Sequence, residues 1–415
     1  MTEQEIARLG PEFGSYLGRY RSCFLQKRTA AHFDNYCRGL LSDLPRKSVE
    51  PIALAAGTAV RTLQEFLTTA AWEFGQMLAF HQRHLADAVA VLPADPLGTV
   101  GIIDETSAVK KGDQTPGVQR QYLGCAGKVE NGIVTVHVAV AKGRFKALLD
   151  AELYLPADWD ADRRRCRDAG IPDNVRYRPK WQIALEQLAR LEQNGIEFDW
   201  LTFDEGYGSQ VPMLRVLNMA KQRFVAEVPK SFAVRPSANG VARRADERLP
   251  VATTKDWQRF RLSRQTTTDQ VWRAKGVCVW AAGRWQRLIA AVNEATGEVK
   301  YFLTNALTSR LGRVLRVAFC RWNVEHVFRV AKQESGLMHY EGRDYTGLMR
   351  HLVLGLVVLG FVSLYTERLR GEKPAGDDGA GLPGVEREVP GAIPSAAWCS
   401  GGAAHQRRDQ VPSVA

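Results

Sequence analysis

Three acidic residues in this sequence occupy positions from which carboxylates can hold a metal ion. Asp104 follows the short apolar run 99–103, and Asp204 follows a similar run, 198–203. A carboxylate at the end of a buried strand is held on rigid scaffold at the rim of a sheet, where ligands of α/β proteins usually lie. For Asp104 taken alone, the alternative is that it caps the following turn, since Asp, Thr and Ser form turns. The second copy of the arrangement favours a shared site.

The third acid, Glu325, lies in a segment with helical spacing. Arg321, Glu325, Arg329 and Lys332 follow one another at intervals of four, four and three residues. At about 100° per residue, all four fall on one face of a helix. A set of ordinary surface ion pairs is the alternative. Further arginines upstream, at 310, 313 and 316, extend the basic stripe and favour contact with nucleic-acid phosphates.

Together, three such acids suit phosphodiester chemistry. Mg²⁺ prefers oxygen ligands and is usually held by few protein carboxylates together with substrate phosphates. Two such ions about 4 Å apart can activate an attacking oxygen and steady the leaving one. The phosphate-binding loop sequence GxxxxGK[ST] does not occur in the chain, so nothing in it indicates ATP use.

Composition describes a globular protein with a polyanionic partner. The chain has 415 residues, a length that allows two or three domains. Of these residues 45% are hydrophobic and 24% charged, as in ordinary globular proteins. Its 56 Lys and Arg residues exceed its 45 Asp and Glu residues, and the resulting net charge of +11 indicates nucleic acid as a binding partner. The seven cysteines are scattered, without a C-x-x-C pair, so we expect reduced thiols in a cytoplasm. The longest apolar run, 352–365, is expected to be a buried helix too short to cross a membrane.

The first part of the chain, residues 1–92, is expected to be helical, because apolar residues recur at three- and four-residue spacing. Its basic residues make it a DNA-binding module or, equally well, a helical bundle with a solvated charged face. After the strand that ends at Asp104, a hairpin is predicted from strands 120–125 and 133–141. Asn131-Gly132 is predicted as its turn.

A helix over 180–194, a strand over 198–203, a helix over 211–222 and a strand over 224–228 follow. The order strand, hairpin, helix, strand, helix, strand is typical of a ribonuclease-H-like core. The charged stretch 158–178 is expected to be exposed, either along a phosphate backbone or as a solvated loop.

The remaining sequence interrupts and then completes this pattern. Residues 231–303 alternate short strands with turns and are predicted to be a β-rich insertion; helix returns over 309–334. The predicted fold class is therefore α/β, a ribonuclease-H-like core of mixed sheet and flanking helices. The predicted domains are a helical DNA-binding domain (1–95), the first part of the core (96–230), the insertion (231–303), the second part with Glu325 (304–370) and a disordered tail (371–415).

Five motifs carry a family resemblance. They are G-I-I-D-E-T-S at 101–107, G-V-Q-R-Q-Y-L-G at 117–124, F-D-E-G-Y-G at 203–208, R-W-N-V-E-H-V-F-R-V-A-K at 321–332 and G-L-M-H-Y-E-G-R at 336–343. With them, the chain resembles the DDE transposases of bacterial insertion sequences, in the branch whose core is interrupted by a β-rich domain. The resemblance runs over roughly residues 10–370.

The resemblance implies that Asp104, Asp204 and Glu325 are both the catalytic and the metal-binding residues, holding two Mg²⁺ ions for which Mn²⁺ can substitute. The related signature Y-x2-R-x3-E-x6-K matches Arg321, Glu325 and Lys332, and the mechanism that the resemblance implies has Arg321, Arg329 and Lys332 position DNA phosphates. Its tyrosine position is Ala318 here, so that tyrosine's contact is not carried over. The neighbouring Glu105 and Glu205 are expected to point elsewhere, since side chains alternate along a strand.

The activity implied is hydrolysis at the element's ends, followed by attack of the freed 3′-OH on target DNA. The implied partners are double-stranded DNA, as terminal inverted repeats and target, and further copies of this chain in a dimer or larger synaptic complex, without a membrane. The implied location is the bacterial cytoplasm, at the nucleoid. Two alternatives stay open: a Mg²⁺-dependent nuclease or resolvase without strand transfer, and a DNA-binding protein derived from a transposase that has lost its chemistry.

Overall fold

The structure, a computed structural model, describes residues 3–253, 255–264 and 267–372. The side chains of 3–8, 263–264, 267–269 and 323–326 lie outside what it describes, as does the predicted disordered tail from residue 373 onward. The chain is mixed α/β, and its described residues form two compact units, one of residues 3–198 and 322–372 and the other of residues 199–321. The first unit is thus discontinuous in sequence. The boundaries of the five predicted domains stay a prediction.

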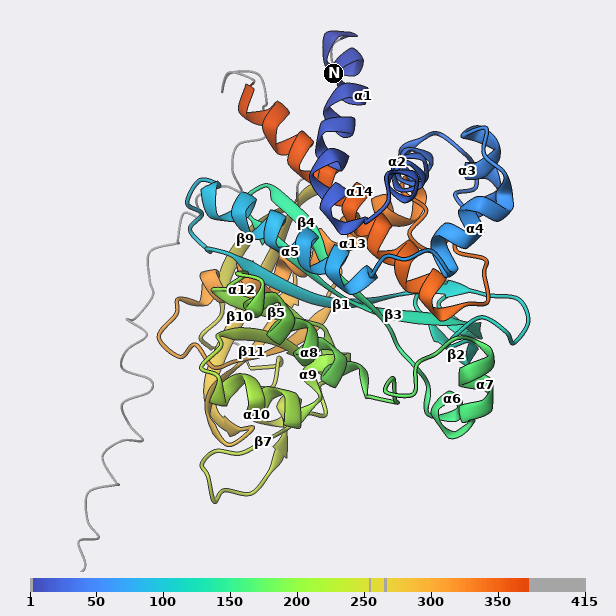
Figure 1. The fold of residues 1–415 in the computed structure, drawn as a ribbon. Coiled ribbons are helices and arrows are strands. Elements are labelled where there is room, and N and C mark those ends of the chain that lie inside the picture. The colour runs from blue at the N-terminus through green and yellow to red at the C-terminus, as the bar shows by residue number, and fades with distance from the viewer. Residues whose placement is uncertain (1–2, 254, 265–266, 373–415) are drawn as a thin grey trace, which may run out of the picture. The chain divides into compact units, whose positions relative to one another are not determined.

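The first unit joins the N-terminal helices to an antiparallel sheet (Figure 1). Its strands are ordered β2-β3-β1, and β4 pairs with the later part of β3. The bounds are α1 (Glu3–Gly18), η1 (Arg19–Cys23), α2 (Lys27–Leu41), α3 (Val49–Ala55), α4 (Val60–Thr68), α5 (Phe74–Val91), β1 (Val100–Val109), β2 (Gln119–Leu123), β3 (Lys128–Lys142), β4 (Phe145–Leu153), α6 (Ala157–Ala161), α7 (Arg163–Asp168), α8 (Lys180–Gln193), α13 (Arg321–Gln333) and α14 (Tyr345–Glu372).

The apolar helix α14 forms the centre of this unit. It packs against β4, α5, α4 and α2, and Tyr16 of α1 donates a hydrogen bond to the Val357 carbonyl (3.0 Å). At 28 residues it is longer than predicted, and by length and composition it passes as a membrane-spanning helix. However, 83% of its most apolar window is buried inside the protein, as predicted for a core helix.

The predicted hairpin turn is wrong. Asn131 and Gly132 lie inside β3, paired with Arg120 and Gln119, and the chain reverses instead at residues 124–127. The Asn131 side chain is occupied in donating to the carbonyls of Lys110 and Gly112. A strand that sequence reasoning missed, β4, makes the longer hairpin with β3.

The second unit holds a mixed sheet in the order β5-β6-β12-β11-β10-β9, where β5 and β6 are parallel and β6 and β12 antiparallel. The predicted β-type runs of 231–303 are confirmed as strands. The bounds are β5 (Trp200–Phe203), α9 (Glu205–Gly208), α10 (Val211–Met219), β6 (Phe224–Val228), β7 (Ala233–Val234), β8 (Arg243–Arg244), α11 (Ala245–Arg248), β9 (Gln258–Arg264), β10 (Thr267–Ala281), β11 (Arg284–Asn293), β12 (Val299–Thr304) and α12 (Leu311–Phe319).

Two further predictions need correction. The helix expected over 309–334 is two helices, α12 and α13, because Cys320 ends the first one. The charged stretch expected to be an exposed excursion or a solvated loop contains two short helices, α6 and α7, whose Trp159 and Cys166 are buried. One apolar residue in each short helix is enough to fix the stretch to the core.

Candidate active site

Asp104 lies in the middle of β1 rather than at its end. Val100–Ile103 are buried, Asp104 and Glu105 are partly exposed, and the strand then continues to Val109. It continues because β3 supplies a partner for every residue from Val100 to Val109. The prediction that the strand stops at Asp104 is therefore wrong, although the site remains on a rigid strand.

The alternation of β1 sends the two neighbouring carboxylates to opposite faces of the sheet. Asp104 pairs in register with His137, and Glu105 with Val136. The Glu105 carboxylate forms an ion pair with Lys180 at the start of α8 (2.7 Å). Glu105 is thus engaged away from Asp104, as predicted.

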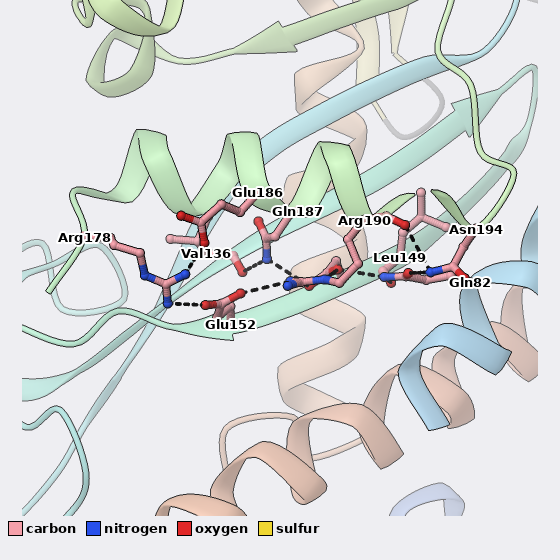
Figure 2. Close-up of polar contacts among 10 residues, drawn as sticks. Gln82, Val136, Leu149, Glu152, Arg178, Glu186, Gln187, Arg190 and Asn194 are labelled. Atoms are coloured by element: carbon pink, nitrogen blue, oxygen red, sulfur yellow. Dashed lines mark hydrogen bonds and ion pairs between the residues drawn. The ribbon is translucent and has the colours of Figure 1, made fainter. Parts of the chain in front are cut away.

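On one face of the sheet, a buried polar network holds α8 on β4 (Figure 2). Asp150 has no exposed surface and accepts hydrogen bonds from both Arg190 (3.0 Å) and Gln82 (2.7 Å). Burial raises the pKa of Asp150, and Arg190 opposes that rise. Glu152, opposite Val136 in register, accepts from Arg190 and Arg178. This network lies on the Glu105 face and leaves Asp104 outside it.

On the Asp104 face, His137 is the residue that sequence reasoning missed. It is buried, its Nε2 lies 2.7 Å from Thr135 Oγ1, and the Phe328 ring of α13 meets it edge-on at 5.1 Å. Burial and the nearby Lys332 charge lower its pKa to about 3, so the ring is neutral. A single histidine within the apolar run of β3 was the available signal.

Helix α13 brings Lys332 near this face. Lys332 is partly buried; burial lowers its pKa, and the charges of Cys125 and Asp104 oppose that shift. Arg329 is exposed. The backbone of Glu325 is helical, but its side chain lies outside the described residues. By helical spacing, position 325 shares a face with 328 and 332.

In the second unit, Asp204 follows β5 directly, as predicted, and serves as the N-cap of α9. Its Oδ1 accepts the amide hydrogens of Gly206 (3.0 Å) and Tyr207 (3.3 Å). Its Oδ2 accepts no hydrogen bond from a described residue. The turn that follows packs closely on β6: a Cβ on Gly208 would lie 1.9 Å from the Glu227 carbonyl oxygen. One carboxylate oxygen is thereby fixed while the other can meet a cation.

Arg321 is held within the second unit. Its guanidinium pairs with Glu227 at 3.4 Å, and Lys300 pairs with the same carboxylate at 2.6 Å. All three side chains are between 15 and 17% exposed. Of the six predicted site residues, the structure thus places Asp104 and Lys332 in the first unit, where the Asp104 charge acts on the Lys332 ammonium group, and Asp204 and Arg321 in the second.

Comparison with known proteins decides the family. The chain matches the family model described as DDE superfamily endonuclease over residues 19–288, which is more than half of its length. The chain belongs to the DDE superfamily endonucleases. It is also 34% identical over 222 residues to the probable transposase for insertion sequence element IS701 of Microchaete diplosiphon. That alignment covers 53% of this chain and 54% of the relative, about half of each.

This endonuclease family match includes Asp104 and Asp204 and ends before Arg321, Glu325, Arg329 and Lys332. Members of the family use divalent metal ions in general. The donor chemistry of the two aspartates fits such an ion, since both offer carboxylate oxygens on fixed backbone. Among the described side chains, no three His, Cys, Asp or Glu residues cluster so as to hold a metal.

Proposed function

We propose that this DDE endonuclease is the transposase of an insertion sequence, which cleaves the element's ends and joins the 3′-OH to target DNA. The match to the DDE endonucleases over a range that includes both aspartates carries the proposal, and the resemblance to a probable transposase supports it. The net charge of +11 suits a DNA partner.

In the proposed site, Asp104, Asp204 and Glu325 are the metal ligands. Two bound Mg²⁺ ions would supply activation of the attacking oxygen and stabilisation of the leaving one. Arg329, which is exposed, and Lys332 would position the phosphates of the cleaved strand. Arg321 could contact a phosphate only after its ion pair with Glu227 breaks. If that ion pair persists, Arg321 would instead orient the start of α13.

The wider organisation is proposed in the same terms. Residues 96–230 and 304–370 would form a ribonuclease-H-like core that the β-rich insertion 231–303 interrupts. The N-terminal helices would bind the terminal repeats, and the chain would act in the cytoplasm as a dimer or larger complex that brings two ends together. The antiparallel order β1-β3-β4 followed by α8, β5, α10 and β6 supports this arrangement.

Cleavage of the DNA that flanks this protein's own gene tests the proposal. We expect native protein to cut at a defined end with Mg²⁺ and not with EDTA. Asp204→Asn should lower the cleavage rate by about a thousandfold or more, since loss of a metal ligand costs several kcal/mol of transition-state stabilisation. Glu205→Gln, which alters the exposed neighbouring carboxylate, is the matched control and should cut normally.

The same reactions separate the alternatives. Joining of the cut 3′ end to a second DNA is expected of a transposase, whereas cutting without joining would indicate a nuclease or resolvase. Binding without any cutting by native protein would contradict catalysis and favour a DNA-binding protein that has lost its chemistry.

A further inference from the structure

Lys47, in the loop between α2 and α3, is a buried lysine that the proposed chemistry does not use. Only 4% of its surface is exposed. Its ammonium group donates to the carbonyl of Leu40 at 2.9 Å, and also to those of Ser42 and Glu334. All three of its hydrogens are therefore directed at backbone oxygens.

These oxygens belong to the ends of two helices. Leu40 and Ser42 are at the C-terminus of α2, and Glu334 directly follows α13. The last carbonyls of a helix lack partners within it and carry partial negative charge, so a cation there is stabilising. One ammonium group thus caps an N-terminal helix and the helix that carries Glu325.

The loop after α13 is fitted to Lys47 as well. The Lys47 amide donates to His339 Nδ1 (3.1 Å). Gly336 has a φ of +62°, and a Cβ added there would lie 2.5 Å from Lys47 Cβ. The glycine at the start of the G-L-M-H-Y-E-G-R motif is therefore required both by backbone conformation and by this close approach.

Lys110 holds the same loop from the other side. It follows the last residue of β1, and its ammonium group donates to the carbonyls of Met338 (3.2 Å) and Tyr340. Burial lowers its pKa to about 8, and the Glu341 carboxylate opposes that shift. A second, partly buried cation thus links the loop to the strand of Asp104.

We propose that Lys47 and Lys110 are positioning residues, which fix the end of α13 against the strand that carries Asp104. Their ammonium groups act through the backbone of residues 334–340, and neither touches the proposed reacting atoms. The catalytic part of this inference rests on the proposed function; the anchoring of α13 does not.

Hydrogen exchange of the full-length protein tests the anchoring without any need for activity. Lys47→Met and Lys110→Met keep most of the length of each side chain and remove the ammonium group, while Lys111→Met, at the exposed neighbouring lysine, is the matched control. We expect amides of 322–341 to exchange about tenfold faster or more in the first two variants only, with β1 and β3 still protected. Gly336→Ala disturbs the same contact from the opposite side and should give the same pattern.

Unchanged exchange in 322–341 would overturn the proposal, and so would equal acceleration throughout the first unit, since the lysines would then hold the whole core.

Single-turnover cleavage at saturating DNA tests the catalytic part. We expect an about tenfold slower rate, a higher Mg²⁺ concentration for half-maximal rate and an unchanged Kd for DNA. Normal cleavage with altered exchange would overturn positioning. Absence of cleavage by native protein would instead count against the proposed function and leave the exchange result standing.

Discussion

At the scale of single residues, burial decides which titratable groups can carry charge. His81 and His351 are both fully buried around α14; His81 Nε2 lies 3.2 Å from the Leu148 carbonyl, and His351 Nε2 lies 3.0 Å from that of Gly336. Burial lowers the pKa of each to about 4. Both rings are therefore neutral parts of the helical core at neutral pH.

This predicts acid sensitivity of the first unit. Between pH 6.5 and about 4, each histidine is protonated in the unfolded chain and neutral in the folded one, so unfolding takes up protons. The free energy of unfolding is therefore highest above pH 6.5. It falls with decreasing pH, by up to about 1.4 kcal/mol per pH unit for each histidine. Urea unfolding at pH 7, 6 and 5 measures this slope. His351→Gln should reduce it; an identical slope in that variant would contradict the assignment.

At the scale of elements, short segments set the geometry of the candidate site. The single turn α9 lies close against β6, and its N-cap is Asp204. Gly208 permits this approach, because any larger residue would meet the backbone of Glu227. The same Glu227 accepts the ion pairs of Arg321 and Lys300. Glu227 of β6 therefore contacts both the turn that follows Asp204 and Arg321, the first residue of α13.

Gly208→Ala should therefore be costly. The added methyl must displace α9 or β6, and we expect a loss of about 1–3 kcal/mol in the free energy of unfolding, as for overpacked cores, together with slower DNA cleavage. Gly75→Ala in α5 is the control, because no atom lies within 4 Å of its added Cβ. It should be neutral or stabilising by up to about 1 kcal/mol. Denaturant unfolding of both variants measures the difference, and equal stabilities would refute the steric argument.

At the scale of the whole molecule, the N-terminal helices depend on a helix from the far end of the chain. Arg350 of α14 is 5% exposed, donates to the carbonyls of Phe66, Leu67, Ala70 and Trp72, and lies 4.5 Å from the centre of the Trp72 ring. The Tyr36 hydroxyl of α2 is hydrogen-bonded to Nδ1 of His351, at 2.9 Å. The helices of residues 3–91 therefore share one core with α14.

An isolated fragment of residues 1–95 should then fail to fold by itself, since α14 supplies much of its apolar contact. We expect helical circular dichroism below that of the same helices in the intact chain and no cooperative thermal transition. A sharp melting curve for the fragment would show instead that residues 1–95 form an independent domain.

The sequence determined the features that depend on neighbouring residues. Amphipathic spacing predicted α8 and the N-terminal helices, β-type runs predicted β5, β6 and the strands of 231–303, and the end of an apolar run located Asp204 at the end of β5. These signals are local, because hydrophobic periods and turn residues act over a few positions. The five motifs taken together also predicted the family.

Only the tertiary structure decided which distant segments meet. It extended β1 beyond Asp104, moved the turn from Asn131-Gly132 to 124–127, and added β4, because strand length is set by the hydrogen-bonding partner. It also buried His137 and Lys47 against carbonyls and rings from remote parts of the chain, and it directed the partly buried Lys110 at carbonyls of residues 338 and 340. A lysine in a sequence is normally a solvated charge; whether it caps two helices depends on where their ends converge, and no local pattern encodes that.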